Sequence, residues 1–98
     1  METLNDLIQS EQPVLIDFYA DWCGPCKTMQ PVIKEVAQQV TGKTRVVKVN
    51  IDKNTQAARQ YAISSVPTFM LFKKGTVLWR HSGTIDRASL LQVIAQKA

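Results

Sequence analysis

The feature that most constrains the fold is a nearly continuous apolar run at residues 14–20, followed two residues later by a Cys-x-x-Cys pair. The run has the length of a strand, and only Asp17 interrupts it with a charge. Strands that are apolar at successive positions are usually covered on both faces of a sheet. We therefore expect a central strand here, with helices packed against each side of it.

Helical periodicity begins directly after this strand. The apolar spacing predicts a helix from Cys23 to about Val40, ended by Gly42, with a buried stripe of Val32, Ile33, Val36, Ala37 and Val40. Elsewhere we expect a short helix near residues 2–10, a strand at 45–51 and a helix from Asn54 as N-cap to about residue 61. A hairpin of strands 68–72 and 76–81 should turn at Gly75. We expect a last helix, capped by Asp86, that buries Leu90, Leu91 and Ile94. The order α-β-α-β-α-β-β-α indicates an α/β fold with a mixed sheet flanked by helices.

Length and composition limit the class of protein. The 98 residues are 45% hydrophobic and 20% charged, which fits one globular domain over residues 1–98. Charges interrupt every apolar stretch before the roughly 20 residues that a membrane helix needs, and the first residues lack the basic and apolar parts of a secretory leader. We expect a soluble cytoplasmic protein that contacts no membrane.

The net charge is +4, but the basic residues are scattered over separate predicted elements, which argues against nucleic-acid binding.

Cys23 and Cys26 are the chain's two cysteines, so the pair serves either as metal ligands or as a redox centre. Structural zinc wants four ligands, and the chain offers only His81 in addition. A purely structural disulfide is disfavoured, because four residues close a loop too short to gain much chain entropy. We expect redox chemistry and no metal.

The start of a helix favours Cys23 as the attacking sulfur. Unpaired N–H groups and the positive end of the helix dipole stabilise its thiolate and lower its pKa towards about 7. Cys26 lies one turn further in, and we expect it to be more shielded from solvent and to resolve the mixed disulfide. Gly24 lets a target backbone approach, Pro25 pre-sets the first helical turn, and Trp22 offers apolar surface beside the sulfur.

Asp17 brings a carboxylate into the buried strand, where desolvation should raise its pKa and make it a proton carrier near neutral pH. A solvent-facing strand residue is the alternative interpretation, and the pattern alone leaves both open.

The run at residues 17–27, which contains Trp-Cys-Gly-Pro-Cys, resembles the signature of the thioredoxin family. Pro31, Lys48, Asp52, Val66-Pro67-Thr68, Gly75 and Gly83 also fall where that family has them, so the likeness extends from about residue 2 to the C-terminus. It implies a thioredoxin fold and an electron carrier that reduces disulfides in protein substrates, as part of cell redox homeostasis. No nucleotide-binding glycine fingerprint is present, so the resemblance implies no bound cofactor and recycling by a thioredoxin reductase that uses NADPH. We expect a monomer.

The same resemblance assigns roles to further residues. It implies that Pro67 is cis and faces the disulfide, and that the backbone of Val66 pairs with an extended substrate. The docking surface would consist of Trp22, Gly24, Pro25, Val66, Pro67, Gly83 and Thr84. Asp17 would lie beneath Cys26 and accept the proton of that thiol, while Lys48 would partly offset the Asp17 charge.

The chain departs from the family at three places. No strand precedes the first helix, so we expect about four strands and an exposed sheet edge at residues 45–51. Tyr19 stands where many relatives have tryptophan, and Ser82 stands where an apolar residue is common; both differences bear on the choice of partner. Two other functions stay open: a glutaredoxin-like reductant that depends on glutathione, and a binding module whose folded surface acts without the dithiol.

Overall fold

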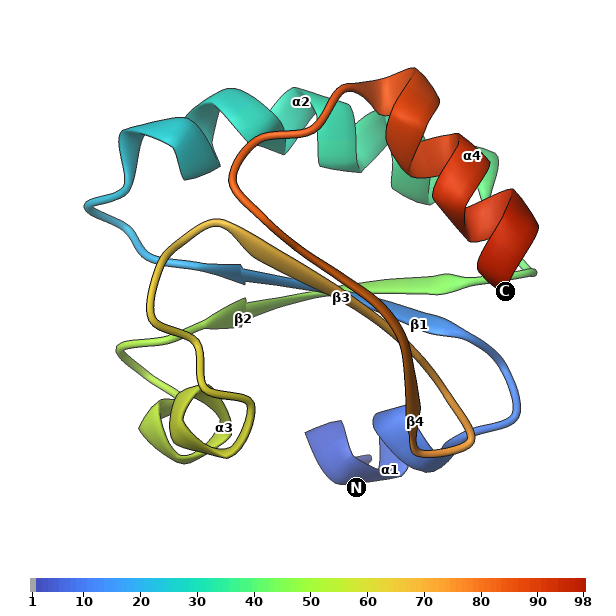
Figure 1. Cartoon of the computed structure of the whole chain (residues 1–98), viewed down its shortest axis with the longest axis horizontal. Helices are drawn as coiled ribbons and strands as arrows, with labels where there is room; N and C mark the ends of the chain where they lie inside the picture. Colours follow the sequence, from blue (N-terminus) through green and yellow to red (C-terminus); the bar gives the residue numbers. More distant parts are fainter. Residues whose placement is uncertain (1) are drawn as a thin grey trace.

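The computed structural model describes residues 2–98, and within them the chain forms four helices and four strands in the expected order (Figure 1). The elements are α1 (Leu4–Gln9), β1 (Val14–Tyr19), α2 (Gly24–Gln39), β2 (Arg45–Asn50), α3 (Thr55–Gln60), β3 (Thr68–Lys73), β4 (Thr76–Ser82) and α4 (Arg87–Lys97). No helix in this part of the chain is long and apolar enough to cross a membrane.

The four strands form one mixed sheet in the order β2-β1-β3-β4. β1 pairs with β2 in parallel and with β3 antiparallel, and the β3–β4 hairpin completes the sheet. Within residues 2–98, β2 is therefore an edge strand, as expected. The central position of β1 explains its apolar run, because such a strand has a neighbour on each side and a helical layer on each face.

Side chains of β1 alternate between two hydrophobic clusters, one on each face of the sheet. Leu15 packs with residues of α2 and α4, whereas Ile16 and Phe18 pack with residues of α1 and with Val49 of β2. Figure 1 shows the corresponding layers, with α2 and α4 over one face and α1 and α3 under the other. By the same alternation Asp17 lies on the face that α2 covers.

The buried stripe of α2 differs from the expected one. Cys26, Met29, Ile33 and Val36 are buried in the helix, and Val40 is buried just beyond it, whereas Val32 and Ala37 are only half-buried. The buried positions recur at alternating steps of three and four residues, which keeps them on one line along the helix, and Val32 and Ala37 flank that line. In α4, Leu90 and Ile94 are buried as expected, but Leu91 is half-buried.

Two predicted caps have different outcomes. The Asp86 side chain accepts a hydrogen bond from the Ser89 N–H and caps α4, as expected. Asn54 does occupy the N-cap position of α3, but its side chain makes no capping bond; its Nδ2 donates instead to the carbonyl of Asn50 at 3.0 Å. Asn54 is therefore the N-cap by position, as expected, but no N–H of α3 donates to its side-chain oxygen, and the bond from Nδ2 turns the amide back towards the turn after β2.

The β3–β4 turn is built on positive φ at both central residues, Lys74 (φ 53°) and Gly75 (φ 80°), which suits the twist of a tight hairpin. The Gly75 N–H donates to the Ile8 carbonyl at 2.9 Å, and the Lys74 N–H donates to the Ser10 carbonyl at 3.0 Å. The turn therefore supplies donors to carbonyls at the C-terminal end of α1.

Candidate active site

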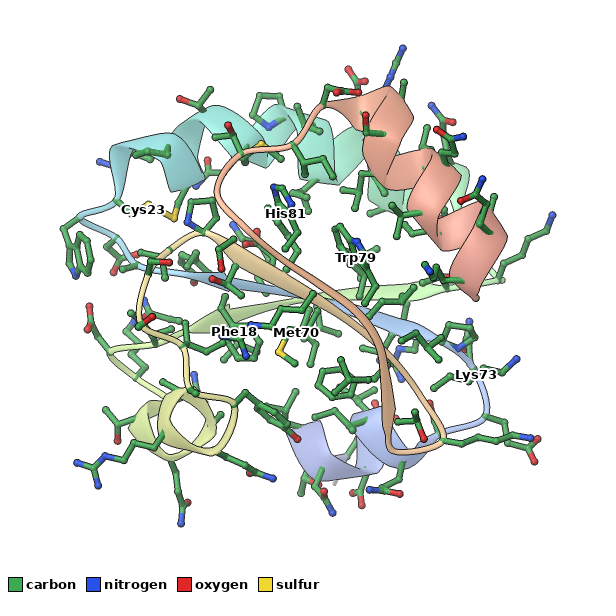
Figure 2. The ribbon with its side chains drawn as sticks, viewed as in Figure 1. Phe18, Cys23, Met70, Lys73, Trp79 and His81 are labelled. Carbon is green, nitrogen blue, oxygen red and sulfur yellow. A yellow bond between two sulfur atoms is a disulfide. The ribbon has the colours of Figure 1, made fainter. Side chains whose placement is uncertain are left out.

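Cys23 and Cys26 form a disulfide where the chain passes from β1 into α2, with their Cα atoms 5.3 Å apart (Figure 2). Both residues are buried, Cys23 with 4% and Cys26 with 5% of its surface exposed. The expectation that Cys26 is the more shielded of the two is therefore wrong for the oxidised protein. Both cysteines belong to one buried cluster with Ala20.

The two sulfurs differ in their contact with the helix terminus. Cys23 is the N-cap residue of α2, and its Sγ accepts a hydrogen bond from the Cys26 N–H at 3.1 Å. Pro25 follows within the first turn, where it needs no N–H partner. The free donors and the positive end of the helix dipole are therefore directed at Cys23, which favours negative charge on its sulfur.

A second loop lies against the cysteines. Val66 packs on the cluster formed by Cys23, Cys26 and Ala20, and the Val66–Pro67 peptide bond is cis, as the resemblance implies. The Gly83 N–H donates to the Pro67 carbonyl at 2.8 Å and joins this loop to the end of β4. The structure thus brings Val66, Pro67 and Gly83 together beside the disulfide, although they are far from it in sequence.

The remaining residues of the expected docking surface are more exposed. A side-chain carbon added to Gly24 or Gly83 would meet nothing within 4 Å, so both backbones face open space. Thr84 directly follows Gly83, and its carbonyl lies 3.1 Å from Nε2 of His81. Thr84 is assigned to the docking surface through its neighbour Gly83.

Among residues 2–98, Trp22 is the most exposed large apolar side chain, with 69% of its surface accessible, yet its indole nitrogen is held in place. Its Nε1 donates a hydrogen bond to the Asp52 carboxylate at 2.9 Å. The Asp52 N–H is in turn bound by the Asn50 side chain at 2.9 Å. The sequence places Asp52 within the family pattern but gives it no role. The one sequence feature that could have indicated its bond to Trp22 is a carboxylate just after the end of β2.

Asp17 is buried, with 3% exposure, and its Oδ1 has no hydrogen-bond partner among residues 2–98. Burial raises the pKa of the Asp17 carboxyl from 3.8 to about 6, and the positive charge of Lys48 opposes this shift. The solvent-facing interpretation of Asp17 is thereby excluded. Asp17 shares the α2 face of the sheet with Leu15, so it lies on the side of β1 that carries the helix of Cys26.

Lys48 is the residue of β2 that pairs with Asp17 across the parallel ladder. Its Nζ lies 4.7 Å from the centre of the Tyr19 ring, within the range of a cation–π interaction. The ammonium group therefore interacts both with a ring at the end of β1 and with the buried carboxylate.

The expected site residues lie outside the cavity on the other face of the sheet. A cavity of about 720 Å³ lies between α1 and α3, on the opposite face of the sheet, and none of the expected site residues lines it. Among residues 2–98, no three His, Cys, Asp or Glu side chains gather in a group that could hold a metal ion. The one reactive group that the site presents is the Cys23–Cys26 pair.

Such a pair can exchange two electrons with another pair of sulfurs, and a helix N-terminus favours the thiolate form that this exchange requires. The chain is thus a thiol-disulfide oxidoreductase.

Comparison with known proteins narrows this class. The thioredoxin family model matches residues 1–96. The chain is 47% identical to thioredoxin 1 of Nostoc sp. over 89 residues, covering 91% of this chain and 83% of that protein. It is 45% identical to thioredoxin 1 of Chlorobaculum tepidum over 94 residues, covering 95% and 93% of the two chains. The chain belongs to the thioredoxin family, its fold is the thioredoxin fold, and its activity is disulfide reduction. A glutaredoxin-like reductant and a non-catalytic binding module are not favoured.

Proposed function

We propose that the protein reduces disulfide bonds of other proteins, with Cys23 as the attacking thiolate and Cys26 as the resolving thiol. The observation that carries this assignment is the hydrogen bond from the Cys26 N–H to Cys23 Sγ at the start of α2. A sulfur that accepts a backbone N–H at a helix N-terminus is stabilised as an anion, and the anion is the nucleophile.

The reaction then proceeds in two exchanges. The Cys23 thiolate attacks one sulfur of the target disulfide, which forms a mixed disulfide and releases the other target sulfur as a thiolate. Cys26 loses its proton and attacks Cys23, which forms the Cys23–Cys26 disulfide and releases the second target sulfur. Two electrons pass from the dithiol to the target, and both target sulfurs leave as thiols after protonation.

Asp17 is proposed to accept the proton that Cys26 loses. A carboxyl group with a pKa of about 6 is ionised at neutral pH but still basic enough to take a proton from a thiol. Its unpartnered Oδ1 and its place on the face covered by α2 support this role. Lys48 limits how far burial raises the pKa of Asp17 and so favours its ionised form.

Substrates are proposed to dock on the surface formed by Trp22, Gly24, Pro25, Val66, Pro67, Gly83 and Thr84. Support comes from the exposed ring of Trp22, the open space over Gly24 and Gly83, and the backbone of Val66, which takes part in no backbone hydrogen bond within residues 2–98. An extended target segment could pair with that backbone as an added strand.

The wider setting is also a proposal. We propose a monomeric electron carrier of one domain over residues 1–98, working in the cytoplasm in cell redox homeostasis, and recycled by a thioredoxin reductase that draws on NADPH. Nucleic acids and membranes are not among the proposed partners. Lys48 and Arg45 on the edge strand β2 support the monomer, because charges on an edge discourage strand pairing between copies.

The assignment of the two cysteines is tested by trapping. In Cys26→Ser the first exchange proceeds and the second cannot, so we expect target proteins to accumulate as mixed disulfides on Cys23. Non-reducing electrophoresis and mass spectrometry of the linked peptides measure the result.

The matched control is Cys23→Ser, which keeps Cys26 and should trap far less. Equal trapping by both single variants would contradict the division of roles. The double variant Cys23→Ser/Cys26→Ser tests the function itself, because an oxidoreductase loses all disulfide reduction in it, whereas a binding module keeps its effect on a partner.

A further inference from the structure

The last residue pair of the β3–β4 ladder joins Thr68 to Ser82, immediately beside the cis peptide bond. Thr68 has no exposed surface, and its hydroxyl donates a hydrogen bond to the Ser65 carbonyl at 2.8 Å. The same Oγ1 lies 3.1 Å from Oγ of Ser82. Both ends of the segment 65–68, which we call the docking loop, are therefore linked through one buried oxygen.

The direction of these bonds follows from the number of protons available. A hydroxyl group has one proton to donate, and a carbonyl can only accept. Because Thr68 donates its proton to the Ser65 carbonyl, Ser82 must be the donor in its contact with Thr68. The three groups form a chain in which Ser82 donates to Thr68 and Thr68 donates to Ser65, and such chains polarise and strengthen each member.

A second bond closes the loop from the same strand end. The Gly83 N–H donates to the Pro67 carbonyl at 2.8 Å. The carbonyls of Ser65 and Pro67 are thus both occupied, whereas Val66 between them has no backbone partner within residues 2–98 and packs against the cysteine cluster. The bonds fix the residues on either side of Val66 and leave its own backbone groups free.

We propose that Ser82 is a positioning residue for substrate docking, whose hydroxyl holds the docking loop so that the free backbone of Val66 faces an incoming target segment. The inference rests on the proposed function of this surface. A loop already held in its binding conformation loses less conformational entropy when the target pairs with it. Ser82 therefore acts on binding, and the thiol chemistry at the start of α2 does not depend on it.

Ser82 is suited to a clean test because its side chain is exposed. In Ser82→Ala the Thr68 hydroxyl keeps its bond to the Ser65 carbonyl, so the fold is retained while the chain of bonds loses its first donor. Ser82→Thr restores a hydroxyl. Thr76→Ala, at the other end of β4, removes an exposed hydroxyl away from the docking loop and serves as the matched control.

The experiment follows single turnovers of the pre-reduced protein with two oxidants, insulin and the small disulfide 5,5′-dithiobis(2-nitrobenzoate). Insulin offers backbone to pair with Val66, whereas the small disulfide has none. In Ser82→Ala we expect the half-saturating insulin concentration to rise about three- to tenfold, as for the loss of one hydrogen bond. The maximal rate and the rate with the small disulfide stay unchanged, and both Ser82→Thr and Thr76→Ala behave as wild type.

Amide hydrogen exchange gives a readout that needs no substrate. If Ser82 holds the docking loop, exchange of the Gly83 N–H, which is bound to the Pro67 carbonyl, becomes faster in Ser82→Ala and returns towards wild type in Ser82→Thr. Wild-type insulin saturation in Ser82→Ala, an equal loss with the small disulfide, or unchanged Gly83 exchange would overturn the inference. A wild-type protein that reduced neither disulfide would overturn the proposed function instead, and Gly83 exchange would still decide the role of Ser82.

Discussion

At the scale of single residues, the reactivity of the site comes from a few contacts that change ordinary side chains. The Cys23 sulfur receives an N–H at the helix start, and the Asp17 carboxyl is kept from water by burial. The Trp22 ring stays exposed while Asp52 holds its nitrogen. Each contact acts on a different property: nucleophilicity, proton affinity and the orientation of an apolar surface.

The proposed proton transfer predicts how the second exchange depends on pH. Asp17 must be ionised to accept the Cys26 proton, so the rate of that exchange should rise with pH around the Asp17 pKa of about 6. Asp17→Asn should slow the exchange and remove this rise, while leaving the first attack by Cys23 intact. Stopped-flow release of the reduced target from pH 5 to 8 separates the two steps.

Lys48→Met is the companion variant. The Lys48 charge lowers the pKa of Asp17, so its removal should raise that pKa and move the rising limb of the profile to higher pH. The variant also removes the cation–π contact of Lys48 with the Tyr19 ring, but that ring is uncharged, so the change in the Asp17 pKa reports the Lys48 charge. A profile that is unchanged, or that moves to lower pH, would refute the electrostatic link between Lys48 and Asp17.

At the scale of elements, the site depends on β1, which lies centrally in the sheet and leads into the helix that carries the disulfide. The opposite end of the sheet is fastened by the β3–β4 turn, whose Gly75 and Lys74 N–H groups bind carbonyls of Ile8 and Ser10. The turn and α1 thus stabilise each other, and the positive φ of Gly75 is needed for both.

Gly75→Ala should destabilise the protein by about 1–2 kcal/mol, because a side-chain carbon is disfavoured at φ 80°. The added carbon would also lie 2.7 Å from Oε1 of Gln9, which must move away. Urea denaturation of the oxidised protein measures the loss. Gly42→Ala is the matched control for the contact with Gln9. Its φ of 84° is as unfavourable for a side chain, but its added carbon meets nothing within 4 Å. Unfolding free energies equal to wild type in Gly75→Ala would contradict this account of the turn.

At the scale of the whole molecule, a buried carboxyl couples folding to pH. The folded protein holds the Asp17 proton more tightly than the unfolded chain, because burial raises the pKa from 3.8 to about 6. Between these two pKa values the folded state binds more protons, so stability falls as pH rises through this window. Above pH 6, the ionised Asp17 carboxylate lowers the free energy of unfolding by about 3 kcal/mol.

Asp17→Asn removes this cost and should be more stable than wild type at neutral pH by about 3 kcal/mol, less whatever the amide loses by being buried. The difference in unfolding free energy between variant and wild type should grow from pH 4 to pH 6 and then level off. Subtracting the two curves cancels the contributions of other carboxyls, such as Asp86, whose pKa its bonds to Ser89 lower. A difference that does not change with pH would refute the burial of an ionisable Asp17.

Much of the element order could be predicted because it depends on local patterns. Apolar periodicity marks β1 and α2, Gly75 marks the turn, and Asp86 marks the start of α4, all from neighbouring residues. Asn54 is the N-cap of α3 as predicted, but the bond from its Nδ2 to the Asn50 carbonyl could not be predicted, because it depends on the path of the turn after β2.

Most of the site lay beyond such reasoning. Nothing in the local pattern indicates that Asp52 binds the Trp22 nitrogen, that Lys48 lies over Tyr19, or that Ser82 donates to Thr68. These pairs are 14 or more residues apart and meet only when strands align in register. Resemblance to a family placed Pro67 near the disulfide, but it could not supply the bond from Gly83 that holds the loop there.

The secondary structure and the position of Cys23 at a helix start can be read from the chain, because both follow from interactions between residues a few positions apart. The equal burial of the two cysteines, the burial of Asp17 and the bonds around the docking loop arise only in the folded molecule. Solvent exclusion and cross-strand contacts depend on which elements pack together, and packing brings distant residues within hydrogen-bonding range.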